Sequence, residues 1–195
     1  MASATSFPRH SSEDLRRFLA ALDSHLTARA EMVVIGGCAI ALGYGVEQTT
    51  NDVDTFETDL THIGAAAEKA RAETGLDIPV GNSTVADLPY HFEDRLQQIL
   101  TELRCLQVFV PERHDLALSK IIRAVEHDFQ AIDELHALQP LDFDTFLTRY
   151  LHEMDHVVAD MNILKQKFLI CVSSLFGEIY EQRARRAIER NRAGQ

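Results

Sequence analysis

Basic side chains are few relative to acidic ones in this 195-residue sequence, with 19 lysines and arginines against 30 aspartates and glutamates. The formal net charge is −11. This balance argues against a broad, sequence-independent grip on nucleic acid, because such binding needs basic surface to displace counterions from phosphates. A local basic patch stays compatible with the overall charge.

Cysteine is scarce as well, and long apolar runs are missing. The three cysteines, Cys38, Cys105 and Cys171, form no Cys-x-x-Cys pair, so we expect small apolar fillers in a reducing compartment rather than a disulfide or a zinc site. No segment reaches the roughly 18 consecutive apolar residues of a membrane span. The N-terminus lacks the apolar run behind a basic start that marks a signal peptide. We therefore expect a cytoplasmic protein with no membrane contact.

The remaining composition is ordinary for a globular protein, with 46% hydrophobic and 25% charged residues. The length suits one compact core with an appended helical segment. We expect a flexible tail over residues 1–10, a domain over 11–138, and a C-terminal helical segment over 139–195 packed on that domain. The sequence leaves the oligomeric state open.

Hydrophobic periodicity predicts strands and helices over the first two thirds of the chain and helices alone over the last third. Residues 91–101 are ambiguous between strand and helix. From residue 112 onward everything reads as helix, with breaks near 139–140 and 160–162. The other predicted elements are a helix from Ser11 to Leu26, a strand over 32–35, a short helix over 38–42, a strand over 52–56, a helix over 60–73, a strand over 76–80 and a strand over 103–110.

Two adjacent glycines follow the first predicted strand. Gly36 and Gly37 lie between the buried run Val33-Val34-Ile35 and the next helix. Glycine lets backbone N–H groups approach a ligand closely, and a helix N-terminus favours an anion. Taken alone, such a pair is compatible with an ordinary tight turn.

A pair of aspartates lies one strand later, in Thr50-Asn51-Asp52-Val53-Asp54. Because side chains alternate along a strand, Asp52 and Asp54 should share one face while Val53 enters the core. Two like charges on one face are destabilising unless they are neutralised. A magnesium ion that also contacts triphosphate oxygens would do this. The other reading is a solvated strand edge.

The glycine pair followed by Thr-x-Asp-x-Asp resembles the minimal nucleotidyltransferases of the polymerase-β-like superfamily, especially AbiEii/MenT-type toxins of type IV toxin–antitoxin systems and related uncharacterised bacterial families. A later helix in those families begins near a proline and an Asp-Leu pair and contains a lysine, an arginine and an aspartate. Here these residues stand in matching order: Pro111, Asp115, Leu116, Lys120, Arg123 and Asp128.

This resemblance implies an α+β nucleotidyltransferase-like fold, a short mixed sheet flanked by helices with a C-terminal helical segment, and a site of defined parts. Asp52 and Asp54 would hold Mg²⁺ and act as catalytic residues with Lys120 and Asp128. The nucleoside triphosphate (NTP) would be bound by Gly36, Gly37, Thr50, Lys120 and Arg123. The reaction would move a nucleotidyl group from the NTP to RNA or tRNA, a protein or a small molecule. A cognate antitoxin or toxin partner is also implied.

Two departures from the family pattern keep a second hypothesis open. Gln48 stands where many relatives carry an arginine, and residues 105–110 contain no acidic residue where polymerase-β-like enzymes often place a third carboxylate. The alternative is a catalytically silent binding or antitoxin-like module.

The helix predicted over residues 112–128 has an apolar face and a charged face. At 100° per residue, Leu116, Ile121, Ile122 and Val125 cluster on the buried side, and Lys120, Arg123 and His127 fall opposite. Asp128 lies about 80° from Lys120, so both side chains could border one cleft. This arrangement also fits an ordinary solvated face, and only the resemblance favours the functional reading.

A competing motif is His152-Glu153-Met154-Asp155-His156, which matches the His-Glu-x-x-His signature of zinc proteases. The histidines lie roughly 140–180° from the apolar stripe of their predicted helix. They should therefore face solvent rather than a cleft, which leaves zinc proteolysis a remote alternative. The stripe consists of Leu147, Leu151, Met154, Val158 and Met161.

Arginines crowd the last predicted helix: Arg183, Arg185, Arg186, Arg190 and Arg192. Cations near a helix C-terminus complement its dipole, which is one explanation. The other is contact with RNA or with an acidic partner.

Overall fold

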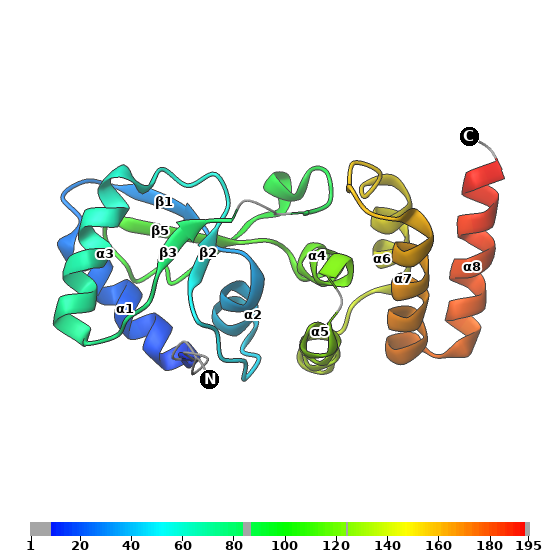
Figure 1. Ribbon diagram of the computed structural model, residues 1–195, viewed down its shortest axis with the longest axis horizontal. Coiled ribbons are helices and arrows are strands. Elements are labelled where there is room, and N and C mark those ends of the chain that lie inside the picture. Colours follow the sequence, from blue (N-terminus) through cyan, green and yellow to red (C-terminus); the bar gives the residue numbers. More distant parts are fainter. Residues whose placement is uncertain (1–8, 84–86, 124, 194–195) are drawn as a thin grey trace, which may run out of the picture. The chain divides into compact units, whose positions relative to one another are not determined.

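The computed structural model describes residues 9–83, 87–123 and 125–193 (Figure 1). The chain divides into two compact units. The sheet unit holds residues 1–85 and 96–111, and the helical unit holds 86–95 and 112–195. The predicted tail lies outside the described residues except for its last two. The predicted boundary at 138/139 falls inside the helical unit and stays a prediction.

The sheet unit contains a mixed sheet, as predicted. Strand β5 pairs parallel with β1 and antiparallel with β4, and β2 pairs parallel with β3. An antiparallel bridge between Val34 and Thr55 joins the two groups of strands. The bounds are β1 Ala30–Val33, β2 Val53–Thr55, β3 Val80–Asn82, β4 Gln97–Ile99 and β5 Leu106–Val110.

The third strand lies later in the chain than the predicted 76–80. The carbonyl of Pro79 accepts a hydrogen bond from the Val53 N–H at 2.8 Å. Proline has no N–H to return, so the regular ladder with β2 begins only at Val80. The ambiguous stretch 91–101 contains both a short 3₁₀ helix, Phe92–Arg95, and strand β4.

Three helices complete the sheet unit: α1 Ser12–His25, α2 Gly36–Tyr44 and α3 Leu60–Thr74. The Ser11 side chain caps α1, as its position before an acidic first turn predicts. Helix α1 packs against α3 (Figure 1), where leucines and Phe18 meet small alanines such as Ala66 and Ala67. Asp23 near the end of α1 accepts hydrogen bonds from three backbone N–H groups at the start of β5, which fixes that strand.

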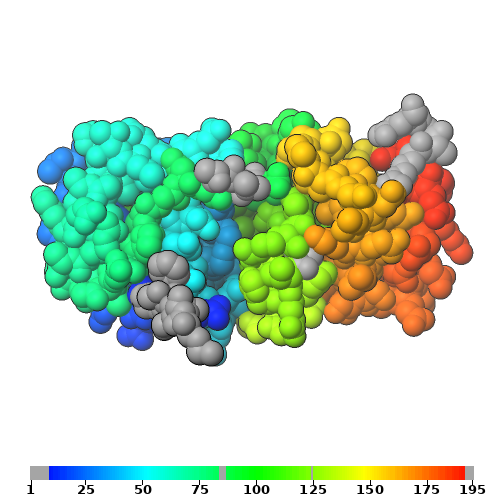
Figure 2. Space-filling model, viewed as in Figure 1, coloured from blue at the N-terminus to red at the C-terminus, as the bar shows by residue number. Residues whose placement is uncertain are grey.

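The helical unit consists of five helices within its described residues: α4 Arg113–Arg123, α5 Glu126–Leu138, α6 Phe143–His152, α7 Met161–Phe176 and α8 Glu178–Ala193. The predicted break near 139–140 is confirmed. The break predicted near 160–162 lies earlier, over 153–160, because α7 already begins at Met161. The end of α4 at Arg123, before α5 begins at Glu126, and the break at Gly177 were not predicted. Side chains fill the space between α7 and α8, which contact each other along their lengths (Figure 2).

Aromatic side chains lie in the core of the helical unit. Phe146 and Phe168 are fully buried, and the Tyr150 and Phe168 rings stack with centroids 3.8 Å apart. Cys38 and Cys171 are buried and Cys105 is partly buried, all three as free thiols. Within the described ranges, none of the helices combines the length and the apolar character needed to cross a membrane.

Candidate nucleotide and metal site

The glycine turn in the sheet unit faces the aspartate motif. Gly36 has a positive φ of +66°, and a Cβ added there would lie 3.7 Å from Oδ2 of Asp54. A Cβ on Gly37 would lie 3.6 Å from the Thr50 hydroxyl. No described side chain caps the N-terminus of α2. The first N–H groups of α2 therefore lie beside Asp54 and Thr50 and are available to an anion.

Strand β2 presents its two aspartates as the alternation predicts. Val53 is fully buried, whereas Asp52 and Asp54 are half-buried. Gly81 is the cross-strand neighbour of Asp54, and the space that a Cβ on Gly81 would enter is open. The Thr50 hydroxyl donates to Oδ1 of Asp52 at 3.3 Å. Asp54 therefore borders open space that a ligand can enter.

Cys38 in the first turn of α2 experiences both carboxylates. Burial raises the pKa of the Cys38 thiol above its ordinary value, and the charges of Asp52 and Asp54 raise it further. The thiol stays protonated at neutral pH and is no nucleophile. Its pKa also indicates that both aspartates contribute negative potential at the N-terminus of α2.

The donor set fits magnesium that arrives with a nucleotide. Among the described residues, no group of three or more His, Cys, Asp or Glu side chains could hold a metal ion. Mg²⁺ differs from Ca²⁺ or Zn²⁺ in binding through only one or two carboxylates while retaining water and substrate phosphate oxygens. Asp52 and Asp54 therefore suit a metal–triphosphate complex better than a metal ion alone.

Lys120, Arg123 and Asp128 come together in the helical unit, but not on one helix as predicted. Helix α4 ends at Arg123, and Asp128 lies in the first turn of α5. The helical-wheel prediction over 112–128 was wrong for Lys120, which is buried rather than solvated, and for Val125, which is exposed. Leu116 and Ile121 are buried, and Arg123 and His127 are exposed, as predicted. The Lys120 ammonium donates to Asp128 Oδ1 at 3.2 Å, and Arg123 Nε donates to Oδ2 at 2.7 Å.

This cluster places two cations on one fully buried carboxylate. Burial lowers the pKa of Lys120, and the nearby Asp128 charge only partly offsets this. Burial opposes ionisation of Asp128, but the Arg123 hydrogen bond and the Lys120 charge outweigh it and hold the pKa of Asp128 below its ordinary value. The two cations and one carboxylate leave the cluster with a net positive charge, which would attract a phosphate group. The Asp128 carboxylate positions the Lys120 and Arg123 side chains. The predicted roles of these three residues toward a nucleotide stay predictions.

Comparison with known families agrees with the predicted class. The family model described as "Nucleotidyltransferase of unknown function (DUF6036)" matches residues 13–172. The chain belongs to the DUF6036 family. No curated protein and no solved structure matches the chain. The nucleotidyltransferase resemblance is thus confirmed at the level of the family, and the AbiEii/MenT-type resemblance stays a prediction.

Gln48 lies beside the glycine turn in this DUF6036 chain. Its Oε1 is buried and has no hydrogen-bond partner among the described residues. The same atom would lie 3.9 Å from a Cβ on Gly37, so it borders the glycine turn. A buried acceptor without a donor costs stability, about 1–3 kcal/mol. An acceptor at this point could serve a hydroxyl or amino group of a ligand.

We expect Gln48→Leu to stabilise the ligand-free protein, because it replaces the unpartnered acceptor with an apolar side chain of similar size. The gain should be about 1 kcal/mol, or roughly 2–4 °C in Tm for a chain of this size. Thermal unfolding followed by circular dichroism measures it. Gln130→Leu, on the exposed face of α5, is the matched control and should change the stability by less than about 0.5 kcal/mol. A lower Tm for Gln48→Leu would show that Oε1 is already satisfied.

An ionic network around Asp115 in the helical unit was missed by the sequence analysis. Asp115 is fully buried and accepts two hydrogen bonds from Arg95 at 3.0 Å and one from Arg149 at 2.8 Å. Arg149 also donates to Glu112, and Arg95 to Glu153, both at 2.6 Å. Burial raises the pKa of Asp115 although both arginines oppose the rise. The network connects the 87–95 segment to α4 and α6, and only a contact between distant parts of the sequence could have revealed it.

The zinc-protease reading fails on the local structure. Helix α6 ends at His152, so His152 and His156 do not lie one turn apart on a helix. The Glu153 carboxylate is bound by Arg95. His152 is exposed as predicted, but the His156 ring is half-buried and lies 4.2 Å from the Tyr90 ring. Val158, which was placed on the apolar stripe, is fully exposed because it lies in the loop after α6.

Proposed function

We propose that this DUF6036 protein transfers a nucleotidyl group from an NTP to an acceptor hydroxyl in a Mg²⁺-dependent reaction. The observation that supports the proposal best is the placement of Asp54 beside Gly36, at the uncapped N-terminus of α2. Anion-binding N–H groups and metal-binding carboxylates then lie within one ligand's reach. A triphosphate with its metal ion needs both.

The residues of the sheet unit have distinct roles in this proposal. Asp52 and Asp54 hold Mg²⁺, which when bound orients the triphosphate and stabilises negative charge at the transferring phosphorus. The first N–H groups of α2 bind phosphate oxygens, and Gly36 and Gly37 leave room for them. Thr50 holds the Asp52 carboxylate in place through its hydroxyl.

The reaction exchanges a phosphoanhydride bond of the NTP for a phosphoester bond to the acceptor. The acceptor oxygen forms a bond to the α-phosphorus as its proton passes to solvent. The bond from the α-phosphorus to the bridging oxygen breaks, and pyrophosphate leaves with the electron pair. The protein contributes positioning and charge stabilisation, which supply most of the catalysis in phosphoryl-type transfers.

The test is incorporation of label from each of the four α-labelled NTPs into total RNA, protein or small-molecule acceptors. We expect label in at least one acceptor with Mg²⁺, and none with EDTA or with the Asp52→Ala/Asp54→Ala variant. Circular dichroism checks that the variant is folded. Wild-type protein that labels nothing beyond this control would contradict the proposal for those acceptors.

A catalytically silent nucleotide-binding module is the second candidate. It is favoured by Gln48, in place of the arginine of many relatives, and by β5, Leu106–Val110, which carries no acidic side chain. Calorimetry with ATP and Mg²⁺ separates it from a protein without nucleotide function. A silent module binds a nucleotide in a metal-dependent manner but labels no acceptor. An enzyme binds the nucleotide and also labels an acceptor.

A further inference from the structure

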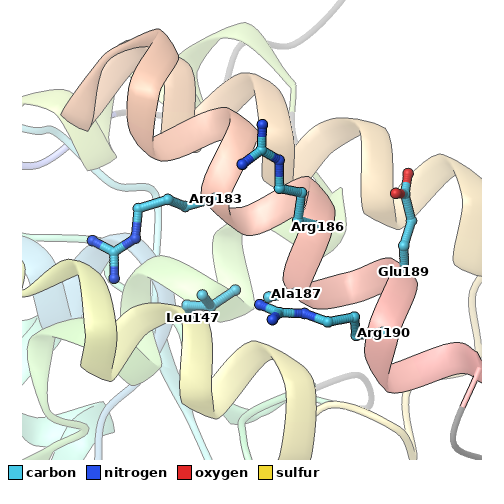
Figure 3. Close-up of a pocket in the computed structure, with 6 residues that line it drawn as sticks. All are labelled: Leu147, Arg183, Arg186, Ala187, Glu189 and Arg190. Atoms are coloured by element: carbon cyan, nitrogen blue, oxygen red, sulfur yellow. The ribbon is translucent and has the colours of Figure 1, made fainter.

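Helix α8 carries an arginine-lined pocket that the nucleotide site does not use. The pocket has a volume of about 580 Å³ and lies between α8 and α6 in the helical unit. Figure 3 shows the Arg183 and Arg190 guanidinium groups on either side of Leu147, while Arg186 and Glu189 extend in another direction from the helix. Its lining residues are Leu147, Arg183, Arg186, Ala187, Glu189 and Arg190.

The positive charge of this pocket is largely uncompensated. Arg183 pairs with Asp144 at 3.0 Å and lies over the Phe143 ring. Arg186 and Arg190 have no ion-pair or hydrogen-bond partner in the described part of the chain. The one acid of the lining, Glu189, lies 3.7 Å from the Lys165 ammonium. In a chain with a net charge of −11, such a local excess of arginine marks a place for an anion.

The spacing of the arginines favours an extended anion over a single phosphate. Positions 183, 186 and 190 fall within about 60° of one another around the helix. They are separated along its axis by roughly 4.5 and 6 Å, at 1.5 Å per residue. One phosphate group would meet one or two of these side chains. A chain of phosphates is long enough to meet Arg183 and Arg190 on either side of Leu147 and also Arg186, which extends away from them (Figure 3).

The apolar parts of the pocket indicate nucleic acid rather than an acidic peptide. Leu147 and Ala187 provide an apolar floor between the arginines. The Tyr180 ring is partly exposed and lies 5.5 Å from the Arg183 guanidinium. Unpaired RNA bases stack on tyrosine rings and on guanidinium planes, while their phosphates pair with arginine. An acidic peptide would use the arginines, whereas RNA would also use the apolar floor and the exposed part of the Tyr180 ring, whose centroid lies 4.8 Å from that of Phe143.

We propose that this surface, the α8 arginine face, binds single-stranded RNA, and that RNA is the acceptor for the transferred nucleotidyl group. The binding stands on the geometry of the helical unit, whereas the acceptor role rests on the proposed function. The three arginines lie outside the residues that the family model matches, whereas Leu147 lies within them. The Arg192 side chain lies outside the described residues.

The test measures binding of a fluorescently labelled 20-nucleotide single-stranded RNA to the full chain in EDTA, so that the metal site takes no part. Arg186→Gln/Arg190→Gln should weaken RNA binding about tenfold at low salt. The slope of log K against log salt should also become shallower by about 1.4, because each lost phosphate contact reduces the slope by about 0.7 for single strands. The matched control, Arg29→Gln/Arg185→Gln, removes the same charge from exposed positions outside the pocket and should change the affinity less than about twofold. Arg186→Lys/Arg190→Lys should retain most of the salt dependence.

Each outcome decides for or against the α8 arginine face. Absence of RNA binding by the wild type, or equal weakening in the two double variants, overturns the proposal. If polyglutamate displaces the labelled RNA as strongly as unlabelled RNA does at the same concentration of negative charge, the α8 arginine face binds an acidic protein instead. Unchanged RNA binding by Asp52→Asn/Asp54→Asn separates this inference from the proposed function. If RNA is labelled in the transfer assay but Arg186→Gln/Arg190→Gln uses RNA normally, this inference alone fails.

Discussion

Asp54→Asn is expected to lower the rate of Mg²⁺-dependent nucleotidyl transfer at least about 1,000-fold. A bound metal ion stabilises the charge of the transition state by several kcal/mol in such reactions. Each 1.36 kcal/mol of activation free energy changes the rate about tenfold. The free energy of unfolding should change by no more than about 1 kcal/mol, because asparagine has the same size and the substitution removes the repulsion from Asp52. Initial rates with saturating NTP, paired with thermal unfolding, measure both effects.

Nucleotide binding should distinguish a metal ligand from a structural residue. In EDTA the Asp54 carboxylate repels the triphosphate, so Asp54→Asn should bind ATP at least as tightly as the wild type. In Mg²⁺ the same variant should bind ATP more weakly, because the metal has lost a ligand. If Asp54 had only a structural role, Asp54→Asn would bind ATP more weakly both in EDTA and in Mg²⁺. Asp77→Asn, at an exposed position in the sheet unit, serves as the control, and activity of Asp54→Asn within threefold of wild type would end the assignment.

Asp115→Ala is expected to destabilise the helical unit by about 3 kcal/mol, the lower end of the 3–5 kcal/mol range for breaking a buried pair. The substitution leaves two largely buried guanidinium groups without their shared carboxylate. Their remaining bonds to Glu112 and Glu153 keep the loss at the lower end. The corresponding fall in Tm is roughly 6–12 °C for a chain of this size. Urea unfolding followed by circular dichroism measures it, since the chain has no tryptophan for fluorescence.

Two further variants show whether the loss belongs to the Asp115 network. Asp155→Ala, at an exposed position in the same unit, should change the stability by less than about 0.5 kcal/mol. Asp115→Ala/Arg149→Met should lose less than the sum of its two single variants, because the second substitution removes one of the charges that the first leaves unpaired. Strictly additive losses, or a loss below 1 kcal/mol for Asp115→Ala, would show that the network contributes little.

The sheet unit followed closely from the sequence because its signals are local. The burial of Val53 between two half-buried aspartates is a consequence of strand alternation, which any register of β2 preserves. The turn at Gly36 likewise requires a positive φ that glycine adopts readily. The displacement of β3 to Val80 is the exception. It follows from Pro79, which has no N–H to donate to β2, so the regular pairing begins only at Val80.

The helical unit was less predictable, because its breaks depend on contacts rather than on composition. Residues 112–128 carry no proline or glycine after Pro111, so a single helix was the natural expectation. The chain instead leaves the helix after Arg123, and Asp128 enters the next helix with its carboxylate on Lys120 and Arg123. The free energy of burying that lysine with its partner is not visible in a helical wheel. The same limit applies to His152 and His156, which the end of α6 separates.

The sequence by itself determined the fold class, the order of the glycine turn and the aspartate pair, and the family to which these motifs point. It could do so because backbone preference and side-chain alternation act over a few residues. Only the tertiary structure decided that Gly36 faces Asp54, that Lys120 is buried against Asp128, that Asp115 holds two arginines, and that three arginines of α8 line a pocket with Leu147 of α6. Each of these depends on residues far apart in the chain, whose desolvation and pairing are fixed only when the folded backbone brings them into contact.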